Sequence, residues 1–229
     1  MQPSEPTPHA RPTSAGGSAA GLAAIGLPFL VVGAAFLGGT TQRWSIALVL
    51  GCFSALLLLR PPRFSLGPAL NTVALLFVAL AAAAFLPARW FVLPPWRIAL
   101  TKDFGVQLAS TVTVQPWLTV EGMILLGAGL CWIYYVATLD ASLRDIRLAA
   151  RLYSAGIIAL AALCLYLHYR GTALPFWHNE RGFGPFPNRN QTGNLFGIST
   201  LVVLGCMQDD FRRGHKRWLL WLFGVGVLT

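Results

Sequence analysis

The sequence predicts an all-α fold, namely a polytopic bundle of helices that crosses a membrane. Of the 229 residues, 55% are apolar and 11% are charged, whereas a soluble domain carries about 25% charged residues. The apolar residues gather in six uncharged runs, with a seventh at the chain end, and most of the six are long enough to cross a hydrocarbon core of about 30 Å. The basic residues form short clusters between these runs, as in membrane proteins whose loop charges set the topology.

The composition excludes three other classes of protein. A disordered chain is poor in aromatic residues, but 12% of this chain is Phe, Trp or Tyr. A disulfide scaffold or a cysteine metal site needs closely spaced cysteines, and the four cysteines stand singly in apolar stretches: Cys52, Cys131, Cys164 and Cys206. The net charge of +9 is spread over several clusters rather than one basic face, so we expect no nucleic-acid partner.

Six complete helices and part of a seventh are expected. Residues 1–18 are rich in Pro, Ser, Thr and Gly and predict a disordered tail. A polar tail of this length does not suit a cleaved signal peptide, so we favour a retained first helix. The expected membrane helices cover residues 19–37, 44–59, 68–86, 122–139, 152–169 and 195–208. The seventh starts at Trp218 and reaches only Thr229, about 18 Å of helix, so we expect a membrane domain over 19–229 that is the first part of a longer protein.

The distribution of basic residues predicts the orientation. Three short connections hold nine cations: Arg60 and Arg63; Arg144, Arg147 and Arg151; Arg212, Arg213, Lys216 and Arg217. Because cytoplasmic connections carry the excess of Lys and Arg, we expect these three connections and the N-terminal tail in the cytoplasm. Two long loops, 87–121 and 170–194, then lie outside. Trp90, Trp96 and Trp117 in the first outer loop are typical of side chains at the level of lipid headgroups.

The polar chemistry is concentrated in the second outer loop, residues 170–194. Arg181 and Arg189 stand on either side of a Gly-Phe-Gly-Pro turn, and a guanidinium offers a planar fork that suits a phosphate. The plainer interpretation is that these arginines anchor the loop to lipid headgroups. A fixed shape, which favours a specific anion site, is indicated by five residues of the loop: Gly182, Gly184, Gly193, Pro185 and Pro187.

A helix end adds to this expected anion site. Asn190, Thr192 or Asn194 is predicted to cap the sixth membrane helix, whose N-terminus would face outward. The positive end of the helix dipole then points to the same place as the two arginines. His178 and Glu180 are the loop groups that titrate closest to neutral pH, but no partner at a recognisable spacing supports a catalytic role for either.

Five loop residues follow a recognisable spacing directly ahead of an apolar helix: Arg181, Gly184, Phe186, Asn188 and Asn190. This pattern resembles the signature of the O-antigen ligase and Wzy polymerase superfamily of bacterial inner-membrane proteins. Pro116 and Thr119, ahead of the fourth helix, are also similar to the family's pattern. Many members have proline between the two asparagines, whereas this chain has Arg189, which resembles a variant found in exopolysaccharide-type members.

The resemblance implies a multi-helix glycosyltransferase with a GT-C-like architecture. Such an enzyme takes a glycan from undecaprenyl diphosphate at the periplasmic face of the inner membrane and passes it to a lipid, glycan or protein acceptor. By the same resemblance, Arg181 and Arg189 bind the diphosphate, and Gly184, Phe186, Asn188 and Asn190 shape the loop. No metal or other cofactor is implied. The catalytic base is implied to lie in later helices, beyond Thr229.

Two other functions stay open. A transporter of a small anion would need polar residues along a path between helices, because only function offsets the desolvation of ionisable groups in a membrane. No ionisable residue lies in the middle of an expected helix. A non-catalytic membrane scaffold is the other alternative, and a natural end of the chain at Thr229 would favour it. Ligase and polymerase are both compatible with the motif, as are different sugars and acceptors.

Overall fold

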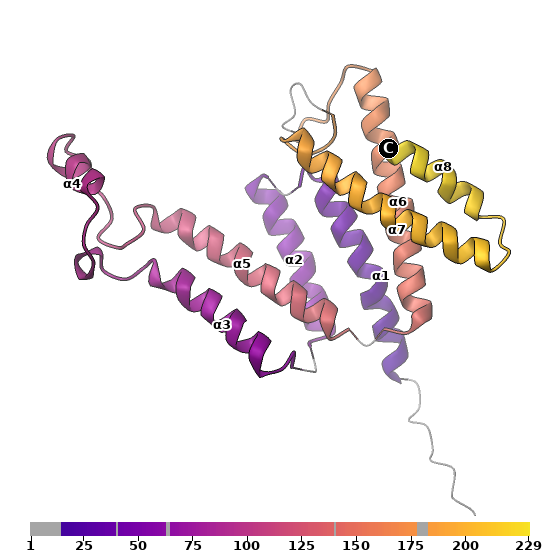
Figure 1. Ribbon diagram of the computed structural model, residues 1–229, viewed down its shortest axis with the longest axis horizontal. Helices are drawn as coiled ribbons and strands as arrows, with labels where there is room; N and C mark the ends of the chain where they lie inside the picture. Colours follow the sequence, from indigo (N-terminus) through magenta and orange to yellow (C-terminus); the bar gives the residue numbers. More distant parts are fainter. Residues whose placement is uncertain (1–14, 40, 63–64, 140, 178–182) are drawn as a thin grey trace, which may run out of the picture. The chain divides into compact units, whose positions relative to one another are not determined.

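The computed structural model describes residues 15–39, 41–62, 65–139, 141–177 and 183–229, and Figure 1 shows them as a set of helices. Eight α-helices and one short 3₁₀ turn form the regular structure of these ranges. The only strand-like feature within them is a single bridge between Pro87 and Thr111. The all-α fold expected from the sequence is therefore confirmed. The predicted tail lies outside the described residues as far as residue 14, and the first helix begins at Ala15.

The chain folds into two compact units. The main unit comprises Met1–Arg60 and Asp140–Thr229 and contains α1 (Ala15–Phe36), α2 (Arg43–Leu59), α6 (Leu143–Tyr169), α7 (Arg189–Arg212) and α8 (Trp218–Leu228). The inserted unit, Pro61–Leu139, contains α3 (Pro68–Ala83), the 3₁₀ turn (Ala88–Trp90), α4 (Pro95–Lys102) and α5 (Pro116–Ala137). Every uncharged run of the sequence falls largely within one of the long helices.

Several helices start earlier than the uncharged runs predict. α6 begins at Leu143, because Ser142 and Asp145 form a capping box: the Ser142 hydroxyl accepts the Asp145 N–H at 3.2 Å, and the Asp145 carboxylate accepts the Ser142 N–H at 3.3 Å. Such reciprocal bonds satisfy amide groups that the helix itself leaves unpaired. Three arginines that we expected in a connecting loop, Arg144, Arg147 and Arg151, therefore lie in the first turns of α6.

Two helices of the described chain are long and apolar enough to cross a membrane, α5 and α6. α2, α3, α8 and the described part of α1 are apolar but shorter. α7 has 24 residues, but its polar first turn and the acidic pair Asp209 and Asp210 near its end lower its hydropathy. The structure thus contains two helices that could span a membrane, which is consistent with a membrane protein. A bundle of six spans stays a prediction.

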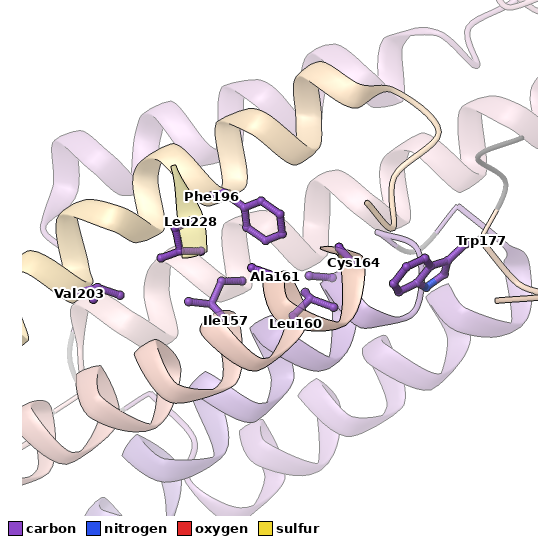
Figure 2. Close-up of a cluster of buried hydrophobic side chains, with 9 residues drawn as sticks. Ile157, Leu160, Ala161, Cys164, Trp177, Phe196, Val203 and Leu228 are labelled. Atoms are coloured by element: carbon purple, nitrogen blue, oxygen red, sulfur yellow. The ribbon is translucent and has the colours of Figure 1, made fainter. Parts of the chain in front are cut away.

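The core of the main unit is built around α6. Ile157, Ala161 and Cys164 face Phe196 and Val203 of α7, and all five side chains are buried. Figure 2 shows the cluster, which Leu228 of α8 joins from one side and Trp177 closes at one end. Close packing of side chains of this kind holds helices together even where the surroundings are as apolar as the side chains themselves, so this cluster joins α6, α7 and α8.

A buried carboxylate reinforces the same three helices at the other end of α7. Asp210 is 1% exposed and accepts hydrogen bonds from the Arg151 guanidinium of α6 and, at 2.8 Å, from the indole N–H of Trp221 in α8. His215 Nδ1 lies 3.9 Å from the same carboxylate. Its neighbour Asp209 is more exposed and pairs with Arg213 at 3.0 Å and Arg151 at 3.3 Å. We refer to Asp210, Arg151 and Trp221 as the Asp210 cluster.

In the inserted unit, α3 and α5 lie side by side, and the segment 84–115 extends beyond their ends (Figure 1). No residue of α3 is buried, and its leucines face outward, as expected of a helix whose solvent is lipid. Trp90, Trp96 and Trp117 are each more than half exposed. Their placement at headgroup level stays a prediction, and their exposure agrees with it.

The Asp210 cluster predicts a large loss of stability for Asp210→Ala. The substitution removes the acceptor of the Trp221 N–H and leaves the part-buried Arg151 guanidinium with only its 3.3 Å contact to Asp209, which we expect to cost about 2–4 kcal/mol. Asp209→Ala is the matched control, because Asp209 is 31% exposed, and its loss should cost about 1 kcal/mol or less. Thermal unfolding of the purified protein in detergent measures both. Equal losses would contradict a role for the buried carboxylate.

Candidate functional site

The candidate site is the loop between α6 and α7 together with the first turn of α7. The loop leaves α6 after Tyr169 and enters α7 at Arg189. Arg181, the first predicted phosphate ligand, lies outside the described residues, as do His178 and Glu180. The described part contains the four loop-shaping residues of the motif and Arg189, the second predicted ligand.

Gly184 brings the loop into direct contact with α7. Its backbone has φ +95°, a conformation that side chains rarely adopt, and a Cβ at this position would lie 2.6 Å from the Thr192 hydroxyl and closer still to its methyl group. Thr192 is 1% exposed and stands on the first turn of α7, while Pro185 is fully buried beside this contact. Only glycine combines this backbone conformation with this approach, which accounts for its place in the motif.

Phe186 makes a second close contact, with the turn after α1. A Cβ on Gly39 would overlap the Phe186 ring, and one on Gly38 would lie 3.3 Å from the carbonyl oxygen of Phe176. Both glycines have positive φ, +77° at Gly38 and +66° at Gly39. The loop therefore packs directly against the turn Gly38–Gly39. We did not predict this contact from the sequence, although a Gly-Gly pair at the end of an apolar run indicates a turn.

Aromatic side chains hold the first half of the loop against α1 and α2. The Trp177 indole N–H donates to the carbonyl oxygen of Phe36 at 2.7 Å, which satisfies a group at the C-terminal end of α1. Phe176 packs edge-on against Phe36, with ring centroids 5.6 Å apart, and against Trp44. Trp177 is itself 6% exposed. This aromatic cluster anchors the loop, and we did not predict it from the sequence either.

The start of α7 differs from the sequence prediction. The N-cap is Asn188, whose side-chain oxygen accepts the Asn190 N–H at 2.9 Å. The prediction that Asn190, Thr192 or Asn194 caps this helix was wrong, because all three residues lie inside the helix. The helix begins six residues before the uncharged run. An asparagine cap stabilises the first turn of a helix even where the residues of that turn are polar.

The cap places Arg189 at the first helical position, exposed to solvent beside Asn188 and Asn190. A charged guanidinium and the positive end of a 24-residue helix therefore coincide at one point. Helix N-termini of this kind bind phosphate and carboxylate groups. The arrangement can hold an anion and stabilise negative charge that develops on it. Among the described residues, no three His, Cys, Asp or Glu side chains come together as metal ligands.

Comparisons with known proteins leave the family open. The chain matches no protein-family model, no curated protein and no solved structure. Membership of the O-antigen ligase and Wzy polymerase superfamily therefore rests on the motif residues themselves and stays a prediction.

Gly184 provides a test of the loop geometry. Gly184→Ala should destabilise the main unit by about 2–4 kcal/mol, because the new Cβ meets Thr192 and the positive φ disfavours any side chain. Gly193→Ala is the matched control: it lies one residue after Thr192 with no atom within 4 Å of its added Cβ, and alanine favours a helix. Unfolding midpoints in detergent compare the two variants. A Gly184→Ala protein as stable as wild type would contradict the close approach.

Proposed function

We propose that this chain is the donor-binding part of a membrane glycosyltransferase of the O-antigen ligase or polysaccharide polymerase type. The observation that carries the proposal is the division of roles within the motif. Gly184, Phe186 and Asn188 each have a packing or capping partner, whereas Arg189 is exposed at the positive end of α7. A loop built in this way presents cationic donors to an anion rather than burying them for stability.

The proposed donor is a glycan on undecaprenyl diphosphate, and the acceptor is a lipid, a glycan or a protein. Transfer breaks the bond between the sugar C1 and the diphosphate oxygen, and the oxygen leaves with the electron pair. The acceptor hydroxyl forms the new bond to C1 and gives up its proton to a general base. Arg189 and the α7 N-terminus, with Arg181 as the second guanidinium, stabilise the departing diphosphate as its negative charge grows. Donors fixed in advance lower such a barrier by a few kcal/mol.

We infer a multi-pass orientation in the bacterial inner membrane with the α6–α7 loop in the periplasm and the N-terminus in the cytoplasm. α6 and α7 pack against each other, with this loop at one end and Arg147, Arg151 and Arg213 at the other. The basic end is the one that remains in the cytoplasm under the positive-inside rule. The motif then faces the leaflet in which lipid-linked glycans await transfer.

Substitution of the arginines in the full-length protein tests this function. Arg189→Ala and Arg181→Ala should each lower the rate of glycan transfer from the lipid-linked donor about 10²-fold, because each removes a donor to developing charge. Lysine at either position should restore part of the rate, since it keeps the charge but not the fork. Arg170→Ala is the matched control: Arg170 belongs to the same loop but lies over the Tyr166 ring, outside the motif, so its rate should stay within about twofold of wild type.

Reconstituted proteoliposomes with lipid-linked glycan and acceptor measure these rates. Wild-type turnover in both arginine variants would exclude the proposed donor site and leave the small-anion transporter and the scaffold as the remaining candidates. Deletion of the gene then separates the two enzyme types. Loss of a ligase leaves completed lipid-linked polymer, whereas loss of a polymerase leaves single repeat units.

A further inference from the structure

The inserted unit contains a pocket that the proposed function does not use. It has a volume of about 790 Å³ and lies within the segment 84–115, beyond the ends of α3 and α5. Its lining includes two arginines, four further polar residues and an aromatic ring: Arg89, Arg97, Thr101, Gln107, Ser110, Thr111 and Phe85. Pockets that bind small molecules have volumes of about 300–1,000 Å³. We call this the Arg97 pocket.

One wall of the Arg97 pocket is rigid. Segment 84–88 pairs with segment 110–113 through three backbone hydrogen bonds of 2.8 Å, from Ala88 to Ser110, from Val112 to Leu86 and from Thr113 to Ala84. Arg97 is 7% exposed and fastens the same segment: its guanidinium donates to the carbonyl oxygens of Val112 at 3.0 Å, Thr111 at 2.8 Å and Ala109. This wall of the pocket is therefore held by the fold itself and needs no ligand to form.

The electrostatics of the pocket favour an anion. The described acceptors of Arg97 are carbonyl oxygens, which carry no net charge, and they engage three of its five N–H groups. Arg89 is exposed and contributes a second guanidinium, while no Asp or Glu lines the pocket. A buried cation without a carboxylate partner gains from a bound anion, because the anion offsets the desolvation of the charge.

We propose that the Arg97 pocket binds the phosphate ester of a polyol. The two guanidinium groups receive the phosphate. Thr101, Gln107 and Ser110 offer hydrogen bonds to hydroxyl groups, and Phe85 offers an apolar surface to the carbon skeleton. Both a glycan phosphate and a glycerophospholipid headgroup have this chemistry. Trp90 and Trp96, exposed in the same segment, are side chains typical of the membrane interface, where both sources are found.

The full chain in phosphatidylcholine nanodiscs tests this site, with glucose 1-phosphate and neutral glucose as soluble probes followed by calorimetry. Glucose 1-phosphate should bind saturably, and glucose about tenfold more weakly or not at all. Arg89→Gln should weaken the binding of glucose 1-phosphate about tenfold, because it removes one charged donor. Lys102→Gln is the matched control, since Lys102 ends α4, the helix that carries Arg97 and Thr101, but does not itself line the pocket. Its affinity should stay within about twofold of wild type.

A second arm identifies the source of the phosphate. Nanodiscs that contain phosphatidylglycerol should reduce the affinity for glucose 1-phosphate if the lipid headgroup is the occupant, and should leave it unchanged if a glycan phosphate is. Both results support the pocket, provided that Arg89→Gln weakens the binding of glucose 1-phosphate about tenfold. Absence of saturable binding in both arms, or equal weakening by Lys102→Gln, would overturn it. Loss of binding in Arg189→Gln but not in Arg89→Gln would also overturn it, and would assign the probe to the α7 site instead.

Discussion

The close approach of Gly184 to Thr192 is the constraint on which the candidate site depends. Two segments meet there without room for a methyl group, so the loop enters α7 by one path only. The Phe186 ring on Gly39 and the Trp177 bond to the end of α1 hold the same loop against a second helix. Because all three contacts engage backbone, they resist displacement better than contacts between long side chains. The backbone of Arg189 is therefore held in place, and only its side chain can change conformation.

The two ends of α7 are fixed by different physical effects. At the N-terminal end, steric fit and a cap position the helix. At the C-terminal end, the buried Asp210 carboxylate joins Arg151 and Trp221. Between them lies the apolar cluster around Ile157 and Val203, which is non-directional and by itself permits sliding. The directional contacts at both ends define the register of α7 along α6, and hence the position of the proposed anion site.

The sequence predicted the centres of the helices well, because an uncharged apolar run has few alternatives to a helix. It predicted their ends poorly, because Ser142 with Asp145 and Asn188 with Asn190 are local hydrogen bonds that a hydropathy pattern does not contain. The partners of the loop were missed for another reason. Gly39 and Phe186 are far apart in the sequence, and nothing near either residue reveals the other. Likewise, the role of Arg97 depends on carbonyl groups of residues 109–112, which only the fold brings to it.

Within the motif, the residues that shape the loop differ from the arginine that we propose to bind the anion. Gly184 has no side chain to offer a ligand, so a change there acts through geometry alone. Arg189 is exposed and starts the helix, so a change there alters charge while the packing of the loop persists. An enzyme whose rate depends on a preorganised cation must be sensitive to both kinds of change. A loop that merely anchors the protein to lipid headgroups needs the charge but not the geometry, because headgroups adapt to the cations they meet. The close contact of Gly184, at positive φ, with the buried Thr192 is thus the feature that favours a specific anion site over a lipid anchor.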